Sequence, residues 1–160
     1  MYPTKNDLPE KVRDKMIELL NARLADATDL QTQTKQAHWN VKGPTFIALH
    51  ELFDKVNEDV EDYVDLIAER VVQLGGVAEG TSRAIVKRTS LPEYAPRGAA
   101  GRDHVEALSS ALATFGKLAR AAIATSADAG DADTADLFTE VSRGTDKWLW
   151  FVEAHLQAER

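Results

Sequence analysis

The sequence predicts an all-α protein, an antiparallel four-helix bundle with a short extra helix in the long connection between its second and third helices. Apolar residues recur at steps of three and four along four long segments, which is the period of an amphipathic helix. Residues 75–101 form one connection that holds most of the glycines and prolines that break helices. Two helices, a long connection and two further helices fit a bundle with one crossover.

The first helix is expected over about residues 9–37, and it ends at the turn signal of residues 41–44. The second is expected over about residues 45–74, where Thr45 can cap its start and Gly75 can end it. A single apolar stripe runs the length of this second helix. It consists of Leu49, Phe53, Val56, Val60, Tyr63, Ile67, Val71 and Leu74.

A short helix is expected over residues 82–88, inside the connection. The third and fourth long helices are expected over about residues 102–126 and 133–158, where apolar residues again follow the helical period. A chain of 160 residues suits one domain with one core. We therefore expect a single domain, residues 1–160, with residues 1–8 as a short N-terminal tail.

Composition narrows the classes of function. The chain has no cysteine, so any metal must be held by His, Asp or Glu. The formal net charge of -7 disfavours phosphate-backbone binding as the main activity. No segment approaches the roughly 20 apolar residues that span a bilayer, and the N-terminus lacks the apolar core of a secretory signal. We expect a soluble, cytoplasmic protein without a membrane partner.

The second helix carries an unusual number of carboxylates. Their ordinary interpretation is a solvated polar face. However, His50 and Asp54 are four residues apart, so they share a side of the helix, and Asp65 and Glu69 repeat that spacing beside the apolar stripe. These pairs indicate metal ligands. The carboxylates of this segment are Glu51, Asp54, Glu58, Asp59, Glu61, Asp62, Asp65 and Glu69.

The two pairs of one chain cannot share a metal, because Asp54 and Asp65 lie about 16 Å apart along the helix axis. They can share one if a second copy lies alongside in the antiparallel direction. A two-fold axis would then bring His50 and Asp54 of one chain to Asp65 and Glu69 of the partner subunit, twice over.

His38 lies at the end of the first helix, and antiparallel packing brings it near the His50 end of the second. A histidine there can also simply complement the dipole at the helix C-terminus. Di-iron four-helix bundles use Glu-x-x-His pairs inside one bundle, and this chain contains none. If iron is handled, an interfacial site must replace the site inside the bundle.

These five residues resemble the ferroxidase signature of the Dps family of ferritin-like mini-ferritins. His38, His50, Asp54, Asp65 and Glu69 form the pattern H-x11-H-x3-D-x10-D-x3-E, with every position filled. Residues 37–44 and 49–54 are similar to the characteristic stretch of the family, and residues 133–136 and 147–151 to its fourth helix. The resemblance covers nearly the whole chain.

The resemblance implies a homo-oligomer, a dodecamer with two-fold and three-fold interfaces around a cavity. It implies that His38, His50 and Asp54 of one subunit face Asp65 and Glu69 of a two-fold mate. It also implies oxidation of Fe(II) to Fe(III), preferentially with hydrogen peroxide, and storage of the ferric mineral. Consuming iron and peroxide protects DNA from oxidative stress. Zinc is an alternative occupant, since histidine and carboxylate also suit it.

Trp39 and three acidic residues can have further roles. Trp39 adjoins His38 and can donate an electron to an oxidising species; its alternative role is interface packing. Glu58, Glu61 and Asp62 can face the cavity and nucleate mineral, or they can be solvated helix surface.

A second acidic cluster lies at the start of the fourth helix. It comprises Asp128, Asp131, Asp133 and Asp136. One or two carboxylates there are explained by capping and by the helix dipole. In Dps relatives this region lines a three-fold iron-entry pore, where carboxylates repeated around an axis would concentrate cations.

Binding to DNA is expected to be weak or absent, because residues 1–15 mix basic with acidic side chains and residues 159–160 carry no basic extension. The alternative function is a DNA-coating, nucleoid-associated protein with a vestigial or zinc-occupied metal centre. A helical interaction module without chemistry is disfavoured by the five-ligand pattern. His104 and His155 lie outside that pattern, and we expect ordinary helix residues at both positions.

Overall fold

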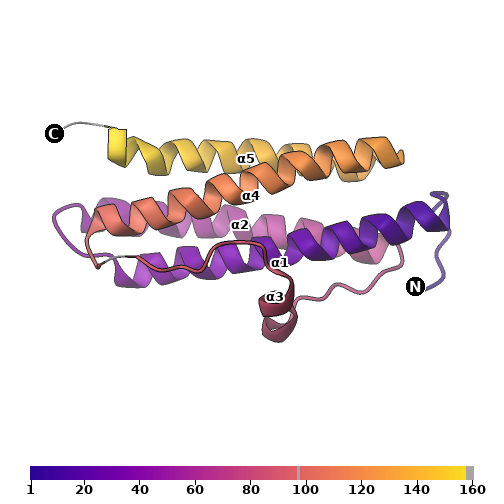
Figure 1. Ribbon diagram of the computed structural model, residues 1–160, viewed down its shortest axis with the longest axis horizontal. Helices are drawn as coiled ribbons and strands as arrows, with labels where there is room; N and C mark the ends of the chain where they lie inside the picture. The colour runs from indigo at the N-terminus through magenta and orange to yellow at the C-terminus, as the bar shows by residue number, and fades with distance from the viewer. Residues whose placement is uncertain (97, 158–160) are drawn as a thin grey trace.

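The computed structural model describes residues 1–96 and 98–157, in which it forms five α-helices. Four long helices run side by side, and the short α3 lies outside the bundle on the connection (Figure 1). The predicted four-helix bundle with an extra helix in its crossover is thereby confirmed. The helices are α1 (Glu10–Asn40), α2 (Phe46–Gln73), α3 (Ser82–Arg88), α4 (Gly101–Ala129) and α5 (Ala132–Gln157).

The helix ends differ by a few residues from those expected. α1 continues to Asn40, so that His38 lies within its last turn. Thr45 is the N-cap residue of α2, but its side chain makes no capping hydrogen bond, which corrects the expected role of its hydroxyl. The expected end of the last helix, at residue 158, lies outside the described residues.

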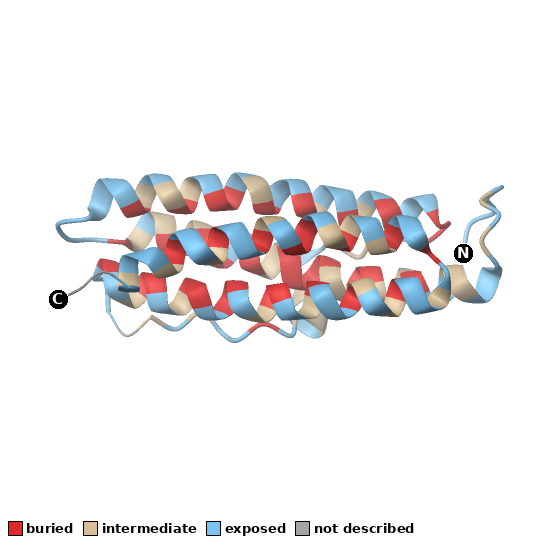
Figure 2. Cartoon of the chain, turned by 90° about the horizontal axis from the view of Figure 1, so that it is seen from above, coloured by how far each residue is buried: buried red, intermediate tan, exposed pale blue. Residues whose placement is uncertain are grey.

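The bundle consists of two antiparallel pairs, α1 with α2 and α4 with α5 (Figure 1). Buried residues lie along the sides of the long helices that face one another (Figure 2). Every member of the predicted apolar stripe of α2 is buried, from Leu49 to Leu74. Burying an aliphatic or aromatic side chain of this size contributes about 1.5–3 kcal/mol, which explains why this stripe orients α2.

Polar side chains of α1 hold the crossover against the bundle. Asn21 donates to the Val77 carbonyl oxygen at 3.1 Å and accepts from the Glu79 amide at 2.9 Å. The fully buried Asp26 accepts from the Ser90 amide at 2.6 Å, and burial raises the pKa of this carboxyl. These bonds satisfy backbone groups that the irregular connection would otherwise leave unpaired.

The N-terminal tail lies against the end of α2. The Tyr2 amide donates to the Gly75 carbonyl oxygen at 2.7 Å. Arg13 joins the two segments, donating to the Leu8 and Leu74 carbonyl oxygens at 3.1 and 3.2 Å. Gly75 has a φ of 88°, a conformation that glycine adopts without a steric cost. None of the helices in the described part of the chain has the length and hydropathy to span a membrane.

Candidate metal centre

His38 and His50 are joined by two reciprocal hydrogen bonds between α1 and α2. The Nδ1 atom of His38 lies 2.9 Å from the His50 carbonyl oxygen, and the Nδ1 atom of His50 lies 2.9 Å from the His38 carbonyl oxygen. The two rings stack with centroids 3.7 Å apart. Because a carbonyl oxygen only accepts, each Nδ1 carries a proton, so in the neutral form of each ring the lone pair lies on Nε2. This is the tautomer that binds a metal through Nε2.

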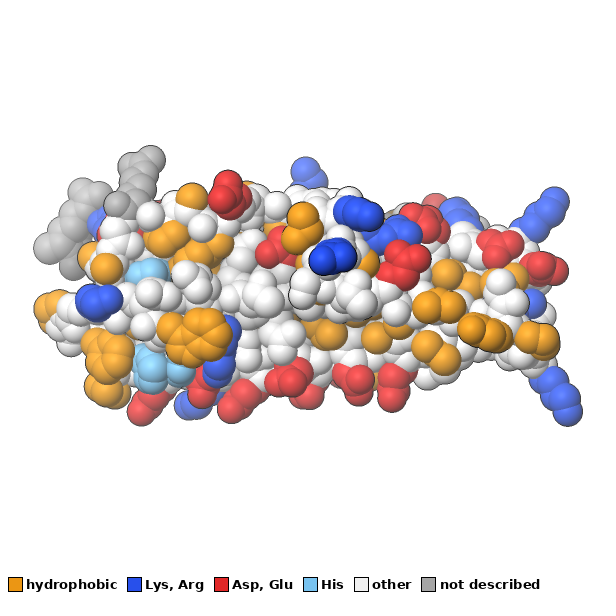
Figure 3. Space-filling view, turned by 90° about the horizontal axis from the view of Figure 1, so that it is seen from below, with side chains coloured by type: hydrophobic (Ala, Val, Ile, Leu, Met, Phe, Trp, Pro, Cys, Tyr) orange, Lys and Arg blue, Asp and Glu red, His pale blue; other side chains and the backbone are white. Residues whose placement is uncertain are grey.

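Local structure explains this pairing. His38 lies in the last turn of α1, where backbone carbonyl groups lack partners within the helix. A tight turn with Gly43 at a φ of 111° then reverses the chain into α2, which brings the turn of His50 back to His38. Histidine side chains gather at one end of the face seen in Figure 3, and acidic side chains follow its lower edge.

Asp54 lies beside the two imidazoles, one turn after His50. Its Oδ1 atom is 3.7 Å from His38 Nδ1, and the ammonium group of Lys35 forms an ion pair with it. The hydrogen bond from Lys35 lowers the pKa of Asp54, and the nearby His38 and His50 contribute in the same direction. Sequence reasoning missed Lys35, although its position one turn before His38 was a signal that it shares that face.

Asp65 and Glu69 are exposed on α2, farther along the helix. Within residues 1–96 and 98–157, no group of three or more His, Asp or Glu side chains is arranged to hold a metal. His38, His50 and Asp54 nevertheless lie beside one another and form a candidate half-site, and Asp65 and Glu69 lie apart from it. Asp54 and Asp65 keep the helical separation of about 16 Å.

The remaining predicted residues of this face are on the surface. The Trp39 side chain is 66% exposed, next to the histidines in sequence. Glu58, Glu61 and Asp62 are also exposed on α2. Their roles in electron donation and mineral nucleation stay predictions.

The structure gives Asp131 a different role from the predicted pore. Its side chain is 1% exposed, and it accepts from Arg70 at 2.8 Å and from the Thr134 amide at 3.0 Å. Asp131 therefore caps α5 and pairs with a buried guanidinium, so it is unavailable to line a channel. Asp128, Asp133 and Asp136 are exposed at the same end of the bundle and stay candidates.

His104 was expected to be an ordinary helix residue, but it is buried and hydrogen-bonded to the crossover. Its side chain is 1% exposed, and its Nδ1 atom lies 2.5 Å from the Tyr94 hydroxyl of the crossover. Burial lowers the pKa of His104, and the Asn40 carbonyl group at the end of α1 opposes that shift. His104 thus joins α4 to the crossover near the α1 turn that carries His38. His155 is exposed on α5.

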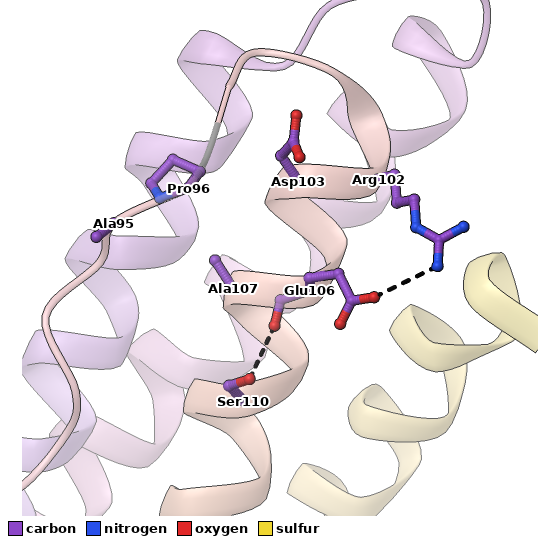
Figure 4. A pocket seen from close by; sticks show the side chains of 7 residues that line it. All are labelled: Ala95, Pro96, Arg102, Asp103, Glu106, Ala107 and Ser110. Carbon is purple, nitrogen blue, oxygen red and sulfur yellow. Dashed lines mark hydrogen bonds and ion pairs between the residues drawn. The ribbon is translucent and has the colours of Figure 1, made fainter.

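A polar pocket of about 500 Å³ lies between α4 and the end of the crossover (Figure 4). Its two longest charged side chains, Arg102 and Glu106, are ion-paired at 3.7 Å. Ser110 donates to the backbone carbonyl oxygen of Glu106 at 2.9 Å. These groups satisfy one another, so the pocket is less suited to a metal than the histidine half-site.

Comparisons with known proteins agree with the four-helix fold. A family model described as a ferritin-like domain matches residues 17–160. A relative named DNA protection during starvation protein, from Agrobacterium fabrum, is 47% identical and covers 98% of this chain and 96% of its own length.

Two solved structures have closely similar folds. DpsC from Streptomyces coelicolor has a TM-score of 0.92 and 33% identity, covering 100% of this chain and 92% of its own. Dps from Microbacterium arborescens in the high iron form has a TM-score of 0.86 and 33% identity, covering 97% and 99%.

Proposed function

The chain belongs to the Dps mini-ferritins of the ferritin-like domain family, and from this premise we propose that it oxidises Fe(II) at centres shared between two subunits and stores the ferric product. The observation that carries the proposal is the reciprocal bonding of His38 and His50, because it holds two imidazole rings together where the Asp54 carboxylate lies 3.7 Å from His38 Nδ1. The name of the Microbacterium relative, a Dps in a high iron form, gives independent support.

The donor set suits the substrate. Two imidazole nitrogens and Asp54 come from one subunit, and Asp65 and Glu69 come from the partner subunit. Nitrogen and carboxylate ligands bind Fe(II) and tolerate its oxidation to Fe(III). Two Fe(II) ions each give one electron to hydrogen peroxide, which takes up two protons and leaves as two water molecules. Peroxide as the preferred oxidant, rather than dioxygen, is part of the proposal, and zinc is the alternative occupant.

Storage requires an enclosed assembly. We propose a dodecamer in which two-fold interfaces complete the metal centres and three-fold interfaces form entry pores. Asp128, Asp133 and Asp136 are the remaining pore candidates, because their carboxylates are exposed. Repeated around a three-fold axis, they would attract Fe(II) toward the cavity. Residues 1–160 act as one domain in this assembly, with residues 1–8 as its tail.

Several surface residues complete the proposal. Trp39 donates an electron when an oxidising species forms at the centre, and its 66% exposure also suits packing at the interface. Glu58, Glu61 and Asp62 nucleate mineral on the inner surface. We place the protein in the cytoplasm, where removal of Fe(II) and peroxide protects DNA without a direct contact.

The second candidate function is a DNA-coating nucleoid protein with a vestigial or zinc-occupied centre. The printed name of the Agrobacterium relative, DNA protection during starvation protein, is the observation that favours it. Against it, the net charge is -7 and the tail is hydrogen-bonded to the bundle through Tyr2 and Gly75. We therefore propose weak or absent DNA binding at physiological salt.

Size-exclusion chromatography with iron detection tests the function. The purified protein receives Fe(II) and peroxide before the separation. We expect ferric iron to elute with a particle of about twelve subunits, as the closed symmetry of the family implies. A particle without iron would favour the DNA-coating function, and a monomer would contradict storage because it encloses no cavity.

A further inference from the structure

A second stripe of residues follows α2 beside its buried stripe. It consists of Ile47, His50, Asp54, Glu58, Glu61, Asp65, Glu69 and Val72. Successive members are three, four, four, three, four, four and three residues apart, so the stripe stays on one side of the helix. Its members are exposed or half-buried in the single chain. This outer stripe of α2 is thus available to a neighbouring molecule.

The order of these steps is the same in both directions along the helix. An antiparallel copy of α2 can therefore pair every member of the outer stripe with another member. In the register that places Asp54 opposite the partner's Asp65, His50 lies opposite the partner's Glu69. In the same register, Ile47 lies opposite the partner's Val72. The spacing that completes the metal centre thus also pairs two apolar residues at each end of the outer stripe.

Ile47 and Val72 are poorly suited to solvent. Their side chains are 61% and 59% exposed, and both belong to a helix whose other outer-stripe residues are polar. Val72 borders a hollow of about 490 Å³ that Ala68, Ala78 and the ligand Glu69 also line. An aliphatic side chain that enters this hollow would remove apolar surface from water on both molecules.

The middle of the outer stripe has the opposite character. In the same register, Glu58 lies opposite the partner's Glu61, so that like charges meet near the two-fold axis. The attraction between the two helices must therefore come from the ends of the outer stripe, where the ligands and the two aliphatic residues lie. The symmetric order of the steps, which pairs Ile47 with the partner's Val72 and His50 with the partner's Glu69, favours a second copy of this chain as the occupant.

We propose that Ile47 of each subunit fills the hollow beside the partner's Glu69 and packs against the partner's Val72. This contact, which rests on the proposed interfacial centre, closes the outer side of each centre against water and fixes the register of the two helices. Exclusion of water lowers the local dielectric constant and strengthens the attraction between the carboxylates and the cation. Ile47 and Val72 are positioning residues, because they act through Glu69 rather than on iron.

Disulfide crosslinking tests the register without relying on activity. The chain has no cysteine, so a variant with Ile47→Cys and Val72→Cys contains only the two introduced thiols. In the proposed pairing, oxidised glutathione removes two electrons and two protons from the facing thiols and links two chains. We expect a covalent dimer on a non-reducing gel after oxidation of the metal-free protein.

The single variants provide matched controls. Ile47→Cys alone and Val72→Cys alone should not crosslink across the two-fold axis, because like positions lie about 37 Å apart along the helix axis. A variant with Val86→Cys and Val72→Cys places one thiol on the exposed α3, outside the outer stripe, and should also stay uncrosslinked.

A second measurement covers the case in which the cysteine pair fails to fold or assemble. Ile47→Glu should raise the Fe(II) concentration for half-maximal oxidation at least about tenfold, the scale seen when support of a metal ligand is lost. Val86→Glu should leave it unchanged. If the wild type oxidises iron but the cysteine pair does not crosslink and Ile47→Glu has no effect, the contact is refuted and the proposed function stands. If the wild type neither assembles nor oxidises iron, both fail.

Discussion

His38 and His50 each donate their Nδ1 proton to the other's backbone carbonyl oxygen, at 2.9 Å in both directions. Each histidine thus fixes the tautomer of the other, and a change of either residue disturbs both. In this candidate centre, the group that orients each imidazole is the backbone carbonyl oxygen of the other histidine.

The first prediction concerns this pair. His38→Gln and His50→Gln remove one nitrogen ligand each and also one of the orienting hydrogen bonds. Each variant should lower the initial rate of Fe(II) oxidation by about 10- to 100-fold. The rate is followed by the absorbance of the ferric product. His155→Gln, an exposed position on α5, is the control and should retain the wild-type rate.

The second prediction concerns Lys35, whose ammonium group pairs with Asp54. A cation that uses Asp54 must displace this group. Lys35→Met should therefore tighten Fe(II) binding by up to roughly fivefold, since a pair between partly exposed groups is worth about 0.2–1 kcal/mol. Anaerobic calorimetry measures the affinity. Lys55→Met on α2 should leave it unchanged, and weaker binding in Lys35→Met would refute the displacement.

The third prediction concerns Asp131, which pairs with Arg70 in the interior and caps α5. Asp131→Asn removes the buried countercharge of Arg70 and leaves only the exposed Asp133 carboxylate, 3.8 Å away, so it should cost about 3 kcal/mol. For a chain of this size the expected fall in Tm is roughly 6–12 °C at fixed protein concentration. The exposed Asp133→Asn should change the Tm little. Equal effects of the two variants would contradict the assignment of Asp131 to the interior.

The helices could be predicted from the sequence where the spacing of apolar residues, or the position of glycine and proline, indicated only one structure. The apolar stripe of α2 indicated the buried face of a helix, and every member of the stripe is buried. The short α3 was bounded by breakers on both sides. The proximity of His50 and Asp54 in the candidate half-site could also be predicted, because their spacing alone places them on one face of the helix.

Contacts between distant segments could not be predicted in this way. Asp131 follows glycine at the start of a helix. An aspartate at that position has the same sequence pattern whether it caps the helix or lines a pore. Only the packing of α2 against α5 brings Arg70 to it. The partners of Asn21 and His104 lie in the irregular crossover, for which periodicity supplies no register.

The fourth prediction uses the buried His104. Its pKa lies below the ordinary value because burial disfavours the charged imidazole. The unfolded chain therefore binds a proton near pH 6.5 that the folded chain does not bind, and stability is lost as the pH falls through that range. The loss is at most about 1.4 kcal/mol per pH unit.

His104→Gln should make the free energy of unfolding less dependent on pH between about 7.5 and 5.5. Urea titration at both pH values measures this difference. Other titrating groups, such as Asp26, whose pKa is raised by burial, contribute equally to the pH dependence of unfolding in both proteins. Their contribution therefore cancels when the variant is compared with the wild type. An identical pH dependence in the two proteins would contradict the role of His104.

The fifth prediction concerns Gly144 of α5. Alanine at a helical glycine usually adds about 1 kcal/mol of stability. Here a Cβ atom would overlap the Tyr63 hydroxyl, so Gly144→Ala should instead cost about 1–3 kcal/mol. Tyr63→Phe removes that hydroxyl and should restore part of the loss in the double variant. Gly116→Ala on α4, whose nearest neighbour would be 3.3 Å away, is the control.

Mixed assembly of two inactive variants tests the shared metal centre most directly. One variant combines His50→Gln with Asp54→Asn, and the other combines Asp65→Asn with Glu69→Gln. The two are unfolded together, refolded and assayed for Fe(II) oxidation. Random pairing across a two-fold axis leaves roughly a quarter of the centres with all five ligands intact, and we expect about that share of the wild-type rate. A mixture as inactive as its components, beside a refolded wild type that is active, would contradict a centre built from two subunits.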